Sequence, residues 1–574
     1  MPFKADVVHR NARIYTLDPD RPWASTMLTD HGTIVAVGGD ELLDQAPCRL
    51  EVVDHQGAFL MPGLADVHNH HQLAGRADLF ELQLDSAGGL PDLLERIQEW
   101  AGALPRGAWV IGGGWSSSLI PQLSDLTVLA ALDAAAGGRP VLLRDHSCHN
   151  RWVSSTALAL AGIDADCPDP ADGIIVRDPI TRTPVGVLIE AALVPVERAY
   201  AAAEPSDVTR NAAASKRGIE TLHSFGVTAF QDAAASLQAL EALKHLDDTG
   251  RLDAWVITSL QVNDKIFGTY PLGQQLIDLR ENYRSAHHRP DFVKIFLDGV
   301  PSARTAAFLD PYLPDDVHGA AWRGQPLFSL DNLTKTLLDV AAQGLSAKIH
   351  CTGDGAVRMT LDAVASIRAA GYTAPIVQIA HGPYIADEDL PRLAQLGVVA
   401  DMSPAMWFPS SIVDAICACL PRERAEKLHP NRSLLDAGVL IAGGSDWPVM
   451  PVPNPWHGIH GLVNRADPTG TRPGQLWPEQ AITVHEALHA YTLGAARAMG
   501  LSDVTGSLTP GKSADFAVLD RDPLSTPAEE LAHTTVTETW FAGRKVYERP
   551  AVRGESMTPP PRAKSSGPRS GAAR

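Results

Sequence analysis

The chain has 574 residues, of which 45% are hydrophobic and 20% charged, an ordinary globular composition that argues against global disorder. Its formal charge of −19 argues against electrostatic capture of nucleic acid or of an anionic membrane. No apolar run reaches the roughly 18 residues of a membrane span, and the start lacks the layout of a signal peptide. Six cysteines without paired spacing do not make a disulfide scaffold. We therefore expect a soluble, cytoplasmic protein.

Both ends of the chain contain short runs typical of β-strands, separated by turns. We predict one composite β-sandwich domain from residues 1–62 and 503–549, with a hairpin between Phe541 and Lys545. Residues 550–574 are rich in Pro, Ser, Gly and Arg, which predicts a disordered tail.

The long middle of the chain alternates short apolar strands with amphipathic helices. Eight such strands, each followed by turn or helical sequence, predict an α/β fold with a (β/α)8 TIM-like barrel over residues 63–502. The eight segments are LADVHNH, GVTAFQDA, AWVITSL, DFVKIFLDG, SAKIHCTGD, PIVQIAHG, GVVADMSP and GVLIAGGSD. The active site of such a barrel lies at the carboxyl ends of its strands.

One interval is too long for a simple barrel. About 155 residues separate His70 from Val227, far more than a βα loop normally contains. We predict a subdomain inserted after the first strand, over residues 72–205, near the barrel mouth. The segments 108–114, 140–145 and 183–190 are its expected strands.

Polar residues that bind metals stand at the ends of several predicted strands. Because alternate residues of a strand share a side, His68 and His70 point the same way and could hold one Zn²⁺-like ion. A pair of ordinary histidines is the alternative. His350 and His381 end two further strands, and Asp446 follows a run of small residues. Barrel closure would bring these strand ends together, so we predict a metal site.

Lys294 lies within a predicted barrel strand, between Phe292 and Phe296. A buried ammonium group beside a divalent metal is costly. The side chain could reach solvent, or its amine could react with CO₂ to form a carbamate that bridges two metals.

The order HxH, Lys, His, His, Asp on successive strands resembles the amidohydrolase superfamily of metal-dependent hydrolases. The segments MPGLADVHNH, VKIFLDG, RTAAFLDPY, IHCTGDGAV, QIAHGPYIADEDLPRL and GGSDWPVMPVPNPW are similar to its YtcJ-like (amidohydrolase 3) group. That resemblance covers residues 5–548. It implies one or two divalent ions, expected to be Zn²⁺, and a ligand set of His68, His70, Lys294, His350, His381 and Asp446. In this scheme Lys294 is the carboxylated bridge, and Asp446 is both the last ligand and the general base.

The chain departs from this group where substrate would be touched. Ala380 replaces an acidic residue, and the stretches 147–155 and 298–306 also differ. We name three candidate substrate contacts: His149 as a hydrogen-bonding group, Trp115 as an apolar wall, and Arg304, which could meet a carboxylate or pair with Asp310. Trp407, Phe408 and Trp447 near strand ends further predict an apolar pocket.

The resemblance implies hydrolysis of a C–N bond in a small, partly apolar amide, with an N-substituted formamide as the first candidate. The attacking group would be a metal-activated hydroxide, since a divalent ion lowers the pKa of bound water from about 15.7 to near 7. Asp446 would carry the proton to the leaving amine. The alternatives are a decarboxylase, an ester or lactone hydrolase, and a non-catalytic regulatory protein. We expect a small-molecule substrate, no nucleic-acid or membrane partner, and a homo-oligomer, with a dimer as the first candidate.

Overall fold

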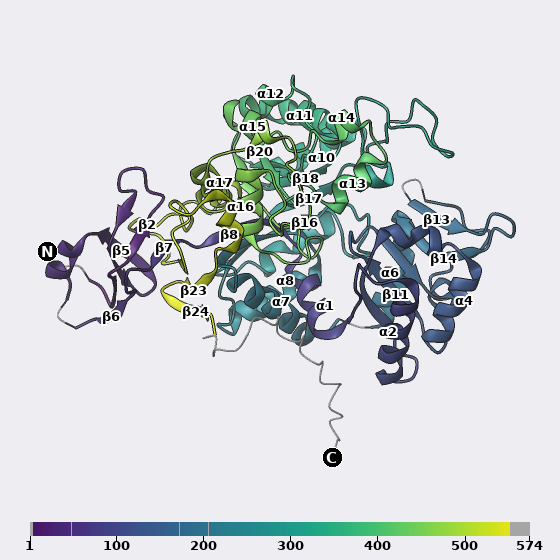
Figure 1. Cartoon of the computed structure of the whole chain (residues 1–574), viewed down its shortest axis with the longest axis horizontal. Helices are drawn as coiled ribbons and strands as arrows, with labels where there is room; N and C mark the ends of the chain where they lie inside the picture. Colours follow the sequence, from purple (N-terminus) through teal and green to yellow (C-terminus); the bar gives the residue numbers. More distant parts are fainter. Residues whose placement is uncertain (1–3, 48, 171–172, 205, 551–574) are drawn as a thin grey trace, which may run out of the picture.

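The computed structural model describes residues 4–47, 49–170, 173–204 and 206–550 (Figure 1). The tail predicted to be disordered lies, beyond residue 550, outside the described residues. None of the described helices is long and apolar enough to cross a membrane.

The centre of the molecule is a parallel eight-stranded sheet that curves into a barrel, in the strand order β21-β20-β19-β18-β17-β16-β15-β8. All eight strands expected from the sequence are present, so the predicted α/β barrel fold is confirmed. The strands are β8 (Leu64–Asn69), β15 (Val227–Ala235), β16 (Trp255–Gln261), β17 (His288–Phe296), β18 (Ser346–Cys351), β19 (Val377–His381), β20 (Val398–Met402) and β21 (Ile441–Gly443).

Helices with one apolar face cover the barrel. In α10, for example, Ser329 caps the first turn by accepting a hydrogen bond from the Asn332 N–H. Leu333 and Leu337, one helical turn apart, are buried in the core around the barrel. The helices outside the inserted segment are α1 (His71–Phe80), α7 (Val208–His223), α8 (Leu237–Asp248), α9 (Gln274–Leu279), α10 (Leu330–Ala342), α11 (Asp354–Ala369), α12 (Leu390–Leu396), α13 (Ser411–Cys417), α14 (Arg422–Ala425), α15 (Asn431–Asp436), α16 (Pro455–Asn464), α17 (Val484–Ala490) and α18 (Leu493–Ala498).

The barrel closes where the segment after β21 meets β8. The Asp446 N–H donates to the His68 carbonyl at 2.6 Å, and the His70 N–H donates to the Trp447 carbonyl at 2.8 Å. Gly444 makes this approach possible, because an added Cβ would lie 2.9 Å from the His68 Cβ. The closure therefore places His68, His70 and Asp446 beside one another.

The inserted segment forms a separate six-stranded sheet, in the order β13-β14-β12-β11-β10-β9. It lies beside the barrel, on the right of Figure 1. The three strands expected from the sequence are β10, β11 and β14, and the sheet has three more that were not expected. Its elements are β9 (Leu82–Gln83), α2 (Leu90–Ala103), β10 (Val110–Trp115), α3 (Ile120–Leu123), α4 (Leu126–Ala135), β11 (Val141–Asp145), β12 (Asn150–Val153), α5 (Ser155–Leu160), β13 (Gly173–Arg177), β14 (Pro184–Glu190) and α6 (Val194–Ala203).

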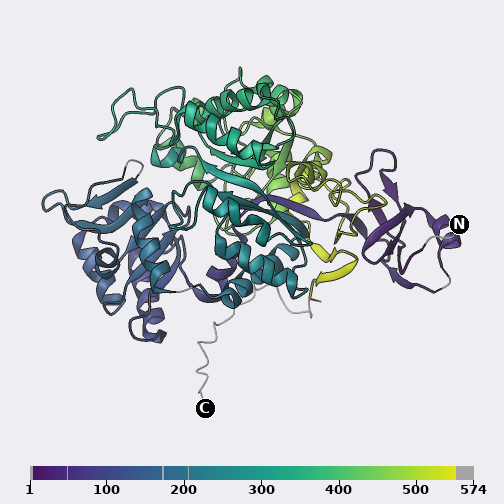
Figure 2. The same cartoon turned by 180° about the vertical axis from the view of Figure 1, so that it is seen from behind.

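Strands from both ends of the chain form two further sheets on the opposite side of the barrel from the insertion (Figures 1 and 2). Their strand orders are β5-β4-β1-β6 and β24-β23-β22-β7-β2-β3. Met27 and Ile34 of the first sheet pack with Leu60 and Phe516 of the second in one buried cluster, as expected for a composite sandwich. The domain boundaries drawn from the sequence stay predictions. The strands are β1 (Val7–Arg10), β2 (Arg13–Tyr15), β3 (Trp23–Ala24), β4 (Thr26–Asp30), β5 (Thr33–Gly38), β6 (Glu51–Asp54), β7 (Phe59–Pro62), β22 (Phe516–Leu519), β23 (Val536–Phe541) and β24 (Arg544–Glu548).

Candidate metal centre

The histidines and the aspartate singled out in the sequence converge at the carboxyl ends of the barrel strands. One ligand atom each from His68, His70 and Asp446 lies within 4.8 Å of the other two. The Asp446 Oδ1 is 3.3 Å from the His70 Nε2 and 3.6 Å from the His68 Nε2. The His381 ring centroid lies 4.8 Å from that of His68 and 4.5 Å from that of His350. Four imidazoles and one carboxylate thus surround one small volume.

Three of the imidazoles use one nitrogen to contact the protein, which leaves the other for a ligand. The His68 Nδ1 lies 2.8 Å from the Asp401 Oδ2. The His381 Nδ1 contacts the Ser403 carbonyl at 2.7 Å, and the His350 Nε2 contacts the Gly299 carbonyl at 3.0 Å. Such outer contacts orient metal-binding histidines.

The remaining nitrogens fit a divalent cation. The His68 Nε2 is buried and has no hydrogen-bond partner among the described residues. Burial lowers the pKa of His68 and His350 well below the ordinary histidine value, and that of His381 to about 4. The rings are therefore neutral at physiological pH, which is the metal-binding form of histidine.

Asp446 is the anionic group of the cluster. Burial by itself would raise the pKa of this carboxyl, but the adjacent imidazoles of His68, His70 and His381 hold it below its usual range. Asp446 and His381 both have positive φ angles, 53° and 74°. Such backbone conformations are rare for residues other than glycine and cluster at functional sites.

Lys294 of β17 is buried in the same region, and its Nζ lies 4.9 Å from the centroid of the Phe296 ring. Burial, together with the neighbouring Lys348 ammonium, lowers the pKa of Lys294 to about 8. Its amine is therefore partly uncharged near neutral pH, and it lines the same cavity as the histidines.

A cavity of about 690 Å³ opens above these residues. Among its described lining residues, Asp446 is the one carboxylate, Lys294 the one lysine, and no arginine is present. Most of the remaining wall is aliphatic, aromatic or hydroxyl-bearing. The apolar part comprises Leu73, Ile120, Ile174, Ile189, Ile266, Phe267, Phe296, Val300, Met406, Ile412, Ile416 and Val449. A cavity of this size and lining suits a small neutral molecule.

His149, from the inserted sheet, also lines the cavity. Its ring centroid is 6.4 Å from that of His350, and its Nδ1 lies 2.9 Å from the Glu190 Oε2. The structure thus brings this predicted contact residue to the cavity that contains the metal-binding cluster.

The other two predicted contact residues lie elsewhere. Trp115 is fully buried in the core of the inserted sheet, where its Nε1 donates to the Leu143 carbonyl at 3.0 Å. Arg304 pairs with Asp315, at 2.8 Å, and not with Asp310 among the described residues. Neither side chain is among the described residues lining the cavity, so their roles as substrate contacts stay predictions.

The predicted aromatic wall also differs from the observed one. Trp407, Phe408 and Trp447 are buried in packing positions, while Phe267 and Phe296 line the cavity. Strand-end position alone did not distinguish a side chain that faces the cavity from one that packs behind it.

The sequence profile of the amidohydrolase family matches residues 51–547. This chain belongs to the amidohydrolase family. The chain is accordingly a hydrolase that acts on carbon–nitrogen bonds. The N-substituted formamide deformylase of Arthrobacter pascens is 29% identical over 559 residues, covering 95% of this chain and 98% of that protein. The putative amidohydrolase YtcJ of Bacillus subtilis is 25% identical, with coverages of 93% and 98%. An uncharacterized metal-dependent hydrolase from Pyrococcus horikoshii shares the fold, with a TM-score of 0.72, 24% identity, and coverages of 91% and 99%.

In this amidohydrolase two residues behind His68 were not predicted from the sequence. Lys348 and Asp401 are completely buried and form an ion pair. The Asp401 carboxylate also accepts the Ser403 hydroxyl at 2.6 Å. A lysine and an aspartate inside otherwise apolar strands, SAKIH and VVADM, were the available signal, because such residues are rarely buried unless paired.

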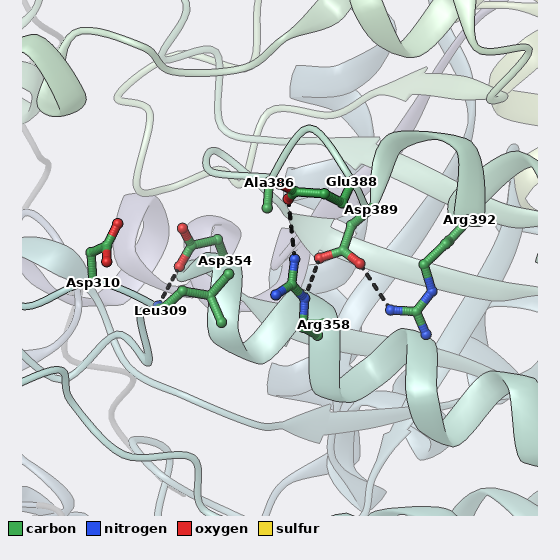
Figure 3. A pocket seen from close by; sticks show the side chains of 8 residues that line it. All are labelled: Leu309, Asp310, Asp354, Arg358, Ala386, Glu388, Asp389 and Arg392. Carbon is green, nitrogen blue, oxygen red and sulfur yellow. Dashed lines mark hydrogen bonds and ion pairs between the residues drawn. The ribbon is translucent and has the colours of Figure 1, made fainter.

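A second depression lies away from this centre, between the start of α11 and the region of α12 (Figure 3). Its Asp389 accepts from the Arg358 Nε at 2.9 Å and from an Arg392 guanidinium nitrogen at 2.8 Å. These charges satisfy one another, and the depression shares no described residue with the metal-binding cavity.

Proposed function

We propose that this amidohydrolase hydrolyses the C–N bond of small, uncharged amides, with N-substituted formamides as the first class to test. The observation that carries the proposal is the cluster of four histidines and Asp446 beside a cavity lined by no other carboxylate and no guanidinium among the described residues. The activity named for the Arthrobacter relative supports the formamide class.

The cluster would hold one or two divalent ions. His68, His70 and Asp446 would bind one ion, and His350 with His381 would bind a second. Zinc is the proposed metal because nitrogen-rich sites with a carboxylate suit it. When bound, such an ion lowers the pKa of a coordinated water and polarises a carbonyl group.

We further propose that Lys294 becomes the bridging ligand. Its partly uncharged amine would attack CO₂, form an N–C bond and release one proton, which gives a carbamate anion. Conversion to an anion would also remove a buried positive charge beside the metal-binding residues.

The protein's own residues would carry the proton. The Asp446 carboxylate is ionised and lies at the edge of the cavity, so it can accept a proton from the attacking water and return it to the leaving amine. The apolar wall, including Phe267 and Phe296, would bind the substituent on the amide nitrogen.

A substrate panel tests this function. Formate release is measured for an N-substituted formamide with an apolar substituent, for a matched formamide that carries a carboxylate, and for the corresponding formate ester. We expect the neutral formamide to have the highest kcat/KM, since the cavity offers no arginine to pair with a carboxylate. Preference for the ester, or absence of hydrolysis of every amide offered in the presence of zinc and bicarbonate, would reject the proposal.

A further inference from the structure

His149 of the inserted segment lines the cavity, and the buried Glu190 lies behind it, hydrogen-bonded to its ring. Strands β12 and β14 are antiparallel neighbours, and the Glu190 N–H donates to the His149 carbonyl at 2.9 Å. The two side chains extend from this pairing so that the Glu190 Oε2 lies 2.9 Å from the His149 Nδ1. With Nδ1 engaged, the Nε2 of the ring remains available to the cavity that His149 lines.

Glu190 also receives contacts from two loops of the barrel. The Thr305 hydroxyl, in the loop after β17, donates to the Glu190 Oε1 at 3.0 Å. The Lys265 ammonium, in the loop after β16, lies 3.7 Å from the Glu190 Oε2. Burial by itself would raise the pKa of Glu190, but His149 and Lys265 lower it to about 2. This completely buried carboxylate is therefore ionised and joins three separate segments at the cavity.

The same contacts extend to a metal-binding histidine through Gly299. A Cβ on Gly299 would lie 2.0 Å from the Thr305 Oγ1 and 2.8 Å from the Lys265 Nζ, so only glycine fits between them. The Gly299 carbonyl is the partner of the His350 Nε2. The position of His149 is thus fixed by the loops that also orient His350.

Glu190 itself has a positive φ of 51°, which is uncommon for a residue with a side chain. Residues held in such conformations are concentrated where a side chain must be aimed. In this conformation the Glu190 carboxylate contacts the imidazole ring of His149, which lines the cavity.

We propose that Glu190 is a positioning residue: it holds the His149 imidazole with Nδ1 toward the carboxylate and Nε2 toward the cavity, where Nε2 contacts the reacting amide of the substrate. This inference rests on the proposed function for the nature of the substrate. The orientation of the ring can be tested without any substrate.

The first test follows the imidazole directly. The protein is labelled with ¹⁵N-histidine and its ring nitrogens are observed by NMR. The His149 signals are identified as those that are absent from the spectrum of the His149→Ala variant. We expect the Nδ1 of His149 in the native protein to carry the proton that faces Glu190, and the fraction of rings with Nδ1 unprotonated to rise in Glu190→Gln. Unchanged His149 signals in Glu190→Gln would overturn the positioning role, whether or not the protein hydrolyses amides.

The second test is a double-mutant cycle in the metal-loaded enzyme. We expect Glu190→Gln to lower kcat/KM by about 100-fold, the loss that a misplacement of about 1 Å in a substrate-positioning contact can cause. In a His149→Ala background the same change should have an effect within about twofold, because Glu190 acts through His149. Equal losses in both backgrounds would show a merely structural role and overturn the proposal.

Controls separate this result from general damage. Glu99→Gln, on exposed α2 of the same inserted segment, should leave kcat/KM and the His149 signals unchanged. If Glu190→Gln does not fold, Thr305→Val takes its place, because it removes one hydrogen bond to the Glu190 carboxylate. Its effect on kcat/KM is then compared with and without the His149→Ala change. If the unmodified enzyme hydrolyses no amide, both the proposed function and the contact between His149 and the substrate are rejected. The NMR spectra still test whether Glu190 orients the His149 ring.

Discussion

The chemistry of single residues in this protein depends on the groups behind them. His68 contacts Asp401, and Asp401 in turn contacts Lys348 and Ser403. All four side chains are buried. A carboxylate that accepts from one imidazole nitrogen orients the ring and makes the other nitrogen a better ligand. Removing Asp401 should therefore weaken metal binding without removing a ligand.

We expect Asp401→Asn to lower zinc affinity by about 10- to 100-fold. Competition with a chromophoric chelator measures this affinity. Asp389→Asn is the control, because Asp389 also joins basic residues but lies in the separate depression of Figure 3. Equal zinc affinity in Asp401→Asn and the unmodified protein would contradict the role given to Asp401.

Asp446 has a different role, since it faces both the histidines and the cavity. We expect Asp446→Asn to lower kcat by at least about 100-fold, because an amide cannot take up the proton. The histidines should keep most of the metal, which elemental analysis of the same sample would measure. A near-normal kcat would show that Asp446 is not the proton carrier.

At the scale of elements, the terminal sheets contain a buried pair of histidines. The His9 Nδ1 lies 3.1 Å from the His55 Nε2, and Phe516 and Trp540 pack around them. Burial, with a smaller contribution from His55, lowers the pKa of His9 to about 3. An unfolded histidine has a pKa of about 6.5, so the unfolded state binds more protons between these values. Folding stability is therefore complete above about pH 6.5 and falls as the pH decreases toward 3.

For His9 alone the loss between pH 7 and pH 5 is about 2 kcal/mol. We expect the thermal midpoint of His9→Gln to fall less over this range than that of the unmodified protein. His31→Gln, at an exposed histidine of the same sheet, should follow the unmodified protein. An equal decrease of the thermal midpoint in all three proteins between pH 7 and pH 5 would contradict the role given to His9.

Elements with a continuous apolar run could be predicted from the sequence, and elements fixed by tertiary pairing could not. The eight barrel strands are largely buried and each contains apolar residues, which is the usual pattern for parallel sheets. Strand β9 has only two residues, and β12, with the sequence NRWV, is half polar. Both form because neighbouring strands pair with them.

The same limit applies to the candidate site. His68, His70, His350, His381 and Asp446 could be found because barrel topology fixes where strand ends meet. The orientation of Trp115 and Arg304 depends on how the inserted sheet and a long loop pack, which no spacing in the sequence encodes. Lys348 and Asp401 were visible as buried charges, but their pairing required the register of three strands.

At the scale of the whole molecule, the barrel lies between the terminal sheets and the insertion (Figure 1). The described lining of the cavity begins at His68 and ends at Val449, so the terminal sheets contribute nothing to it. The barrel supplies the metal-binding cluster, and the insertion supplies His149 and part of the apolar wall. We therefore propose that the barrel carries out the chemistry and that the insertion, with the loops it contacts, selects among substrates.

We propose that the strand ends hold a metal. Elemental analysis of protein prepared with bicarbonate but without added metal tests it most directly. We expect one or two zinc-like ions per chain, with two supporting the bridge at Lys294, and a clear loss of metal in the His68→Ala, His70→Ala double variant. Absence of bound metal from the unmodified protein, even after zinc is offered back, would contradict the claim.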